Sequence, residues 1–186
     1  MPKITEAKIL IMATHGFEQS ELEVPLNGLR EEGATVHVAT LDGKAIKGWK
    51  DKDWGDEFSA DLKISDVKVD DYIALVLPGG QMNPDILRAD EETVAKVREF
   101  VSSDKIVAAI CHAPWLLIEA GVVKGREMTS YHSIRTDLKN AGANVVDKEI
   151  AISNGIITSR SPEDLEAFVS KIVEEVKEGE HERKVA

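Results

Sequence analysis

The chain has 186 residues, of which 42% are hydrophobic and 31% charged, a balance typical of one domain with a full core and a soluble surface. Lys and Arg number 23 against 34 Asp and Glu, and the resulting net charge of −11 argues against a nucleic-acid partner. No apolar run approaches the roughly 20 residues of a membrane-spanning helix. The first residues lack the apolar core of a signal peptide, so we expect a cytoplasmic protein without a membrane partner. The single cysteine, Cys111, excludes an intrachain disulfide and a cysteine-based zinc cluster.

Short apolar runs alternate with amphipathic segments in the first part of the chain. Residues 8–14 form a nearly continuous apolar run, which predicts a strand buried on both faces. Residues 18–32 carry apolar side chains at helical spacing, and Gly33 is placed to end that helix. Pro25 inside this pattern predicts a kink or a later start. Residues 35–40 alternate between apolar and polar and predict a second strand.

The middle of the chain contains an irregular stretch followed by two more strand and helix pairs. Residues 41–70 carry scattered glycines, two tryptophans and mixed charges, and we expect short strands and a loop there. Residues 72–77 predict a buried strand, and residues 91–101 predict a helix with valines on its inner face. Residues 106–110 predict another buried strand, followed directly by a helix over residues 114–121.

The last part of the chain carries a hairpin and a final helix. Asn154-Gly155 lies between the apolar runs 150–152 and 156–158, a strong signal for a two-residue hairpin turn. Ser161-Pro162 is placed to open the final helix, with serine as the cap and proline in the first turn. Residues 179–186 are highly charged, and we expect a frayed tail there.

The order of these elements predicts an α/β fold, in which a mostly parallel sheet carries helices on both faces. We expect one domain over residues 1–178. Active sites in such sheets form at the carboxyl ends of the strands. Three segments therefore converge by topology: residues 14–18, Pro78-Gly79-Gly80 and Cys111-His112.

Cys111 sits between a buried strand and a helix that begins near Pro114. Such a sharp strand-to-helix turn is the arrangement of a hydrolase nucleophile elbow, which pushes the side chain out of the sheet. The amino end of the helix favours a thiolate over a thiol, which predicts a low pKa for Cys111. A buried, inert core cysteine is the alternative, and the position at the turn favours the reactive one.

Two further side chains could serve this thiol. His112 could act as a general base or as a fixed hydrogen-bond partner, or it could be a turn histidine bonded to backbone. Glu18 would stabilise a thiolate if it is buried and protonated, and is otherwise a solvated acid at the start of a helix. His15, Glu18, Glu21 and Glu23 could suggest a metal cluster, but solvation at the start of the helix explains these acids better, so we expect no metal.

Gly79 and Gly80 lack side chains, so their backbone N–H groups could approach a substrate oxygen closely. Together with the amide that follows the nucleophile they could form an oxyanion hole, and a plain turn is the alternative. Asp85 is the nearest acid along the chain that could orient His112.

The segment Ala109–Leu117, taken together with Leu77–Gly80, resembles the PfpI family. That family includes an archaeal intracellular cysteine protease and bacterial general stress proteins, and belongs to a superfamily with the parkinsonism-associated protein deglycase. The resemblance runs from about Ala7 to Val176. Further matching segments are Phe17-Glu18, Glu21-Leu22, Thr129-Ser130-Tyr131 with Ile134, and Asn140-Ala141-Gly142.

The resemblance implies a flavodoxin-like three-layer sandwich, a homodimer or larger homo-oligomer, and no cofactor. It assigns Cys111 as the nucleophile, His112 as its partner and Glu18 as the carboxyl that tunes the sulfur. It also assigns the amides of Gly80 and His112 to the oxyanion hole. In the protease branch a glutamate of a neighbouring subunit completes a triad. Asp85 stands at that position and is one methylene shorter, which disfavours proteolysis more than it disfavours thiol reactivity.

Three functions are compatible with these residues. The first is a stress-related deglycase or glyoxalase, in which a Cys111 thiolate attacks small electrophilic carbonyls or the adducts they form on glycated protein. The second is an intracellular peptidase that acts on unfolded peptides through an acyl-enzyme and requires Asp85 from across a subunit interface. The third is a non-enzymatic sensor or chaperone whose Cys111 is oxidised to sulfenic or sulfinic acid.

Overall fold

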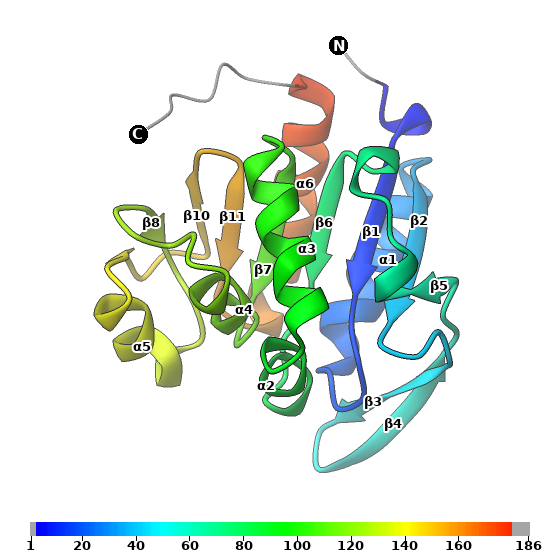
Figure 1. The fold of residues 1–186 in the computed structure, drawn as a ribbon, viewed down its shortest axis with the longest axis horizontal. Coiled ribbons are helices and arrows are strands. Elements are labelled where there is room, and N and C mark those ends of the chain that lie inside the picture. Colours follow the sequence, from blue (N-terminus) through cyan, green and yellow to red (C-terminus); the bar gives the residue numbers. More distant parts are fainter. Residues whose placement is uncertain (1–2, 180–186) are drawn as a thin grey trace.

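A seven-stranded sheet forms the centre of the computed structural model, which describes residues 3–179 (Figure 1). The strand order is β10-β11-β7-β6-β1-β2-β5. All neighbouring strands run parallel except β10 and β11, which form an antiparallel edge hairpin. The strands are β1 Lys8–Met12, β2 Thr35–Thr40, β5 Leu62–Lys63, β6 Ala74–Leu77, β7 Ile106–Ile110, β10 Ile150–Ser153 and β11 Ile156–Ser159.

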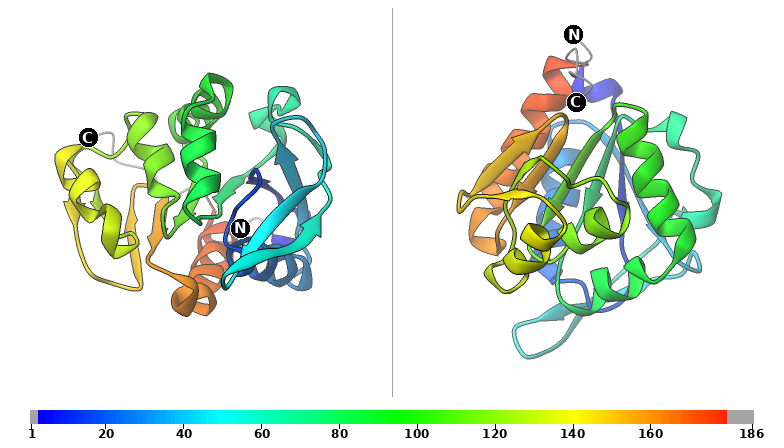
Figure 2. Two further views of the ribbon diagram at one scale, coloured as in Figure 1. Left: turned by 90° about the horizontal axis from the view of Figure 1, so that it is seen from below. Right: turned by 60° about the vertical axis from the view of Figure 1, so that its left-hand side comes forward.

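Helices cover both faces of this sheet and give three layers, which the view from below in Figure 2 shows edge on. Helices α1 and α6 pack on one face, and α2, α3 and α4 pack on the other. This confirms the predicted α/β, flavodoxin-like architecture. The helices are α1 Gln19–Glu31, α2 Met82–Arg88, α3 Glu91–Ser102, α4 Pro114–Glu119, α5 Arg135–Asn140 and α6 Leu165–Glu178. Short 3₁₀ turns lie at Ile4–Glu6, Ile64–Asp66, Val69–Asp71, His132–Ile134 and Pro162–Asp164. Among residues 3–179, no helix combines the length and the apolar character that crossing a membrane requires.

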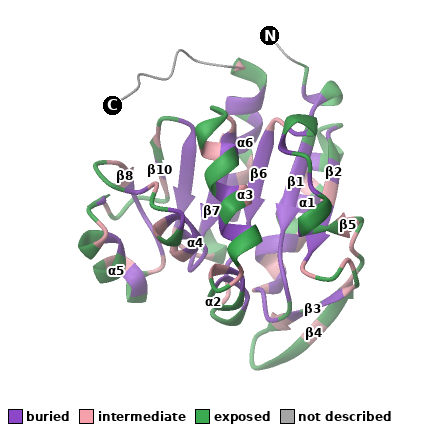
Figure 3. Cartoon of the chain, viewed as in Figure 1, coloured by how far each residue is buried: buried purple, intermediate pink, exposed green. Residues whose placement is uncertain are grey.

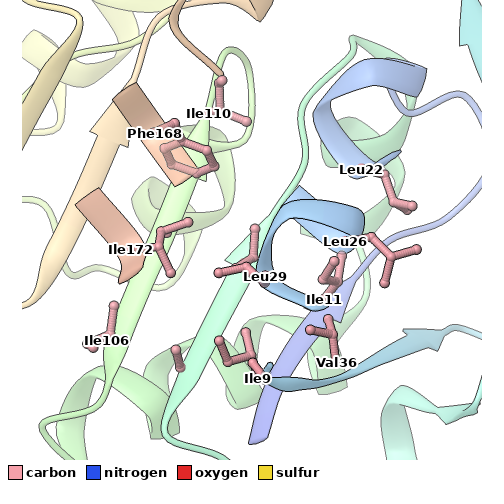
Figure 4. Close-up of a cluster of buried hydrophobic side chains, with 14 of the residues drawn as sticks. Ile9, Ile11, Leu22, Leu26, Leu29, Val36, Ile106, Ile110, Phe168 and Ile172 are labelled. Atoms are coloured by element: carbon pink, nitrogen blue, oxygen red, sulfur yellow. The ribbon is translucent and has the colours of Figure 1, made fainter. Parts of the chain in front are cut away.

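The central strands are apolar on both sides because each face of the sheet is covered. In β1, Ile9 and Ile11 point toward α1 and α6, whereas Leu10 and Met12 point toward the opposite layer. Figure 4 shows the first of these clusters, in which side chains of α1 and α6 meet those of the strands. The centre of the molecule is buried, and the exposed residues lie on the outer helix faces, the loops and strand β4 of the flanking hairpin (Figure 3).

Two regions flank the main sheet. The irregular stretch 41–70 contains the antiparallel hairpin of β3 Ile46–Lys50 and β4 Asp53–Phe58, in agreement with the short strands expected there. The hairpin extends below the carboxyl ends of the strands in Figure 1. A small parallel pair, β8 Glu127–Met128 and β9 Asn144–Val145, lies beyond the β10 edge of the main sheet.

Most predicted elements are confirmed, with differences at their ends. Strands β2 and β7 have the expected bounds, and the Asn154-Gly155 hairpin is present. Helix α1 begins at Gln19 and runs through Pro25. The final helix begins at Leu165, because Pro162–Asp164 forms a separate 3₁₀ turn. Helices α2 and α5 were not expected. Beyond Gly179, the predicted frayed tail lies outside the described residues.

Candidate active site

Cys111 occupies the sharp turn between β7 and α4. Its φ angle is +65°, a left-handed conformation that costs a non-glycine residue about 1–2 kcal/mol. Two backbone hydrogen bonds hold the residue there: its N–H donates to the Ser159 carbonyl at 3.0 Å, and its carbonyl accepts from the Tyr131 N–H at 2.9 Å. The backbone N–H groups of Gly80 and His112 lie close to the sulfur and favour its ionised form. The backbone is therefore strained at the one residue that the sequence marked as a nucleophile, which is typical of functional turns.

The carboxyl group beside this sulfur belongs to Glu21. The Glu21 side chain is fully buried, and its Oε2 accepts a hydrogen bond of 2.8 Å from the Gly79 N–H. Its other oxygen, Oε1, has no nitrogen or oxygen partner, and the carboxyl group interacts with the Cys111 thiol. A Cβ atom added at Gly79 would lie 2.5 Å from Oε2 and 2.8 Å from the Cys111 Cβ, so only glycine permits this approach. The Gly79 amide thus holds Glu21, and of the two predicted glycines Gly80 alone presents its N–H to the sulfur.

The structure corrects the expectation that Glu18 tunes the sulfur. Helix α1 begins at Gln19, so Glu18 occupies the N-cap position ahead of the first turn. It is only partly buried there, and its Oε1 accepts a hydrogen bond of 3.3 Å from Ser20 Oγ. Glu21 lies nearly one turn further along the helix, where the side chain faces inward to the edge of the sheet.

His112 contacts Cys111 directly. Its Nδ1 lies 3.2 Å from Cys111 Sγ, and its Nε2 lies 3.1 Å from Ser133 Oγ. The ring stacks on Tyr131, with ring centroids 4.8 Å apart, and makes an edge contact with Trp115, with centroids 5.3 Å apart. Burial, with a smaller contribution from the charge of His132, lowers the pKa of His112, so the imidazole is neutral at pH 7 and can accept a proton.

Asp85 lies on the exposed surface of α2 and forms an ion pair of 2.6 Å with Arg88. Within the chain, the partner of His112 Nε2 is Ser133, not Asp85. Arg88 in turn sits 4.5 Å over the ring of Trp115. The delivery of Asp85 to His112 of a neighbouring subunit stays a prediction.

The Cys111 thiol and the Glu21 carboxyl cannot both be charged, because they lie in contact in a buried site. Burial raises the pKa of Glu21 to about 8, so this carboxyl keeps its proton at neutral pH. Burial, followed by the charge of Glu21, also raises the pKa of the Cys111 thiol. The low pKa expected for Cys111 is therefore wrong, because burial is the largest cause of the raised pKa and the charge of Glu21 only adds to it. A protonated Glu21 removes that repulsion and can donate its O–H to the sulfur, as the Gly80 and His112 amides do with their N–H groups.

Cys111 and His112 open into a cavity of about 530 Å³. Its lining comes from the three converging segments, from the starts of α1 and α2, from the β3–β4 hairpin, and from Tyr131 and Pro162. The lining residues are Gly16, Glu18, Glu21, Trp49, Asp51, Gly80, Gln81, Met82, Cys111, His112, Tyr131 and Pro162. Among residues 3–179, no three His, Cys, Asp or Glu side chains lie close enough together to hold a metal ion.

Sequence reasoning missed two residues of this site. Glu21 could have been found from the helix period, since a residue three positions after an N-cap turns toward the core when the helix lies on the sheet. Ser133 follows Cys111 by 22 positions in an irregular segment, and no local pattern marks it.

Replacing Glu21 by leucine will slow thiol alkylation at pH 7 by about tenfold or more, because a charge-assisted hydrogen bond contributes roughly 1.5–3 kcal/mol. The measurement is the iodoacetamide rate of the single cysteine against pH. The matched Glu18→Leu variant will shift the profile much less. A larger shift for Glu18→Leu than for Glu21→Leu would return the tuning role to Glu18.

The stability of the protein will depend on pH through Glu21. Its pKa is raised from 4.5 to about 8, so between these values the folded state holds a proton that the unfolded state releases. Stability therefore falls as pH rises across this window, by up to about 1.4 kcal/mol per pH unit. Urea unfolding from pH 4.5 to 8 will show that Glu21→Gln gains stability relative to the wild type as pH rises, whereas the exposed Glu57→Gln control runs parallel to the wild type. If the difference in unfolding free energy between Glu21→Gln and the wild type stays constant from pH 4.5 to 8, the buried, protonated carboxyl is contradicted.

Replacing Ser133 by alanine will lower the kcat of turnover at the Cys111 thiol several-fold and leave the KM of that reaction nearly unchanged. With His112 Nε2–H donating to Ser133 Oγ, Nδ1 is left to accept the thiol proton, so the loss of this bond frees the ring to take the other tautomer. The kcat–pH profile will shift as well, and Ser133→Thr, which keeps the hydroxyl, will restore both. Equal losses for alanine and threonine would mean that Ser133 only packs against the ring.

Comparison with known proteins places the chain in a family. Residues 7–175 match the model of the DJ-1/PfpI family, which confirms the resemblance seen in the sequence. The chain is 42% identical over 166 residues to a deglycase of Thermococcus kodakarensis, an alignment that covers 89% of this chain and 97% of that protein. It is 41% identical over 163 residues to protein/nucleic acid deglycase 2 of Escherichia coli, with coverage of 87% and 92%. Drosophila melanogaster DJ-1beta has a crystal structure of the same fold, with a TM-score of 0.84 and 31% identity over 92% of this chain and 90% of that one. The chain belongs to the DJ-1/PfpI family.

Proposed function

We propose that this protein is a cysteine-dependent deglycase or glyoxalase that acts on small dicarbonyls and on their early adducts with proteins. The observation that carries the proposal is the contact of Cys111 Sγ with both a neutral His112 and the buried Glu21, at the wall of an accessible cavity. The deglycase names of two relatives at about 40% identity support it.

The chemistry requires only the groups of this site. The thiol gives its proton to His112, and the thiolate adds to the aldehyde carbon of methylglyoxal to form a hemithioacetal. When the dicarbonyl is already bound to an amine as a carbinolamine, the sulfur displaces that amine at the same carbon, and His112 returns the proton to it.

The remaining steps convert the hemithioacetal into a hydroxy acid without an external oxidant. His112 moves a proton from the carbon bound to sulfur to the neighbouring carbonyl carbon, so the first carbon is oxidised while the second is reduced. The product is a lactoyl thioester of Cys111. Water cleaves this thioester to lactate and regenerates the thiol. The Gly80 and His112 N–H groups lie at the sulfur, where they can stabilise the oxyanion that forms on the adjacent carbon.

The peptidase alternative receives less support from this chain, because Asp85 is already paired with Arg88 and a subunit interface would have to redirect it. The oxidation sensor stays open, since a protonated Glu21 could also donate to a sulfinate. A homodimer or larger homo-oligomer stays a prediction.

Methylglyoxal consumption and lactate release will be lost in Cys111→Ser and will fall at least tenfold in His112→Ala, because these residues supply the nucleophile and the base. The assay uses purified protein, with a fluorogenic peptide tested in parallel. Turnover by Cys111→Ser at the wild-type rate would contradict the proposal, and peptide cleavage without lactate release would favour the peptidase.

A further inference from the structure

The cavity wall opposite the nucleophile is built by a different part of the chain. Cys111 and His112 lie at the carboxyl end of β7, whereas Glu18 precedes α1, and Trp49 and Asp51 come from the β3–β4 hairpin. Figure 1 shows that the hairpin runs beneath the carboxyl ends of the strands. We refer to Glu18, Trp49 and Asp51 as the hairpin wall.

The hairpin wall is fixed in place by bonds to the start of α1. The Trp49 N–H donates to the Phe17 carbonyl at 2.7 Å, and Glu18 and Trp49 form a parallel β-bridge. The Gln19 side chain accepts from the Asp56 N–H at 2.8 Å and donates to the Asp56 carboxylate at 2.6 Å. The wall is thus positioned before any substrate arrives, which reduces the entropic cost of binding.

The hairpin wall carries negative charge without a counter-ion. Burial and the nearby charge of Asp51 raise the pKa of Glu18. Among residues 3–179, neither carboxylate forms an ion pair, and no Lys or Arg lines the cavity. Glu21, fully buried at the base of the same cavity, keeps its proton at neutral pH, so the charge of the cavity comes from Glu18 and Asp51.

The third member of the wall is an aromatic ring. Trp49 lines the cavity and is held in an edge contact with Trp54, with ring centroids 5.6 Å apart. Indole is the aromatic group that attracts cations best, and a guanidinium ion can stack on it while bonding carboxylates. An aromatic ring beside two unpaired carboxylates favours a planar organic cation and disfavours an anion.

We infer that the hairpin wall selects dicarbonyl adducts carried on arginine side chains over uncharged adducts and free dicarbonyls. This inference rests on the proposed function and names its preferred substrate class. In an arginine adduct the carbon that sulfur attacks is bonded directly to a guanidinium nitrogen. The positive charge therefore lies next to the reacting carbon, within the same cavity as Glu18 and Asp51. A cysteine adduct has no charge there.

The experiment compares three substrates: methylglyoxal, and its freshly formed adducts with N-acetylarginine amide and N-acetylcysteine amide. The quantity measured is the ratio of kcat/KM for the arginine adduct to kcat/KM for methylglyoxal. The double variant Glu18→Gln, Asp51→Asn will lower this ratio about tenfold at low salt, and added salt will reduce the difference. The control Glu57→Gln removes an exposed charge from the same hairpin outside the cavity and will leave the ratio unchanged. An unchanged ratio in the double variant overturns the inference.

A second measurement is independent of turnover. N-acetylarginine amide will protect Cys111 from iodoacetamide in the wild type, and the double variant will lose this protection. Protection that survives in the double variant, or that N-acetylcysteine amide provides equally, overturns the inference. If the wild type turns over none of the substrates, the proposed function fails, and the protection assay still decides whether the wall binds a guanidinium ion.

Discussion

The contact between the buried Glu21 carboxyl and the Cys111 sulfur is the constraint on which the rest of the site depends. Ionising a carboxyl group with no exposed surface costs free energy, so Glu21 keeps its proton. The Cys111 sulfur has Glu21 as a hydrogen-bond donor only while that proton stays in place. The close approach is possible because Gly79 has no side chain and gives its N–H to the carboxylate oxygen. The strain of the Cys111 backbone then brings the sulfur to the same point.

The elements that bring Glu21 and Cys111 into contact are the same elements that form the core of the fold. Strand β7 is buried on both faces, and the backbone must turn sharply after it to enter α4. Helix α1 packs against the sheet through Leu22, Leu26 and Leu29, which places Glu21 beside the carboxyl ends of the strands. The first turn of the same helix also positions the hairpin wall, because Gln19 accepts a hydrogen bond from the Asp56 N–H of β4. The carboxyl group beside the sulfur and the hairpin wall are therefore both held by α1.

The elements that sequence predicted well are those whose pattern is set by burial. Strand β7 is a run of five apolar residues covered on both faces, so its bounds follow from hydrophobicity alone. Asn154-Gly155 adopts positive φ angles that few other residues tolerate, which makes the hairpin visible in the sequence. Helix α2 was missed because it is short and contains Pro84, and α5 because its six residues are mostly polar.

The sequence identifies Cys111 as the candidate nucleophile but identifies only some of the side chains around it. Cys111 could be inferred from the strand, turn and helix around it. The choice between Glu18 and Glu21 depends on where α1 begins, and a difference of three residues moves a side chain from the cavity mouth to the interior. Ser133 reaches His112 through a tertiary contact across 21 positions, which no local pattern encodes.

The protonation state of Glu21 tests the account most directly. Infrared difference spectra at pH 7, below the pKa of about 8, will show the carbonyl stretch of a protonated, buried carboxylic acid. The band will persist in Glu18→Gln, shift when Cys111 is alkylated and disappear in Glu21→Gln. A spectrum without this band at pH 7, or a band that survives Glu21→Gln, would contradict the account.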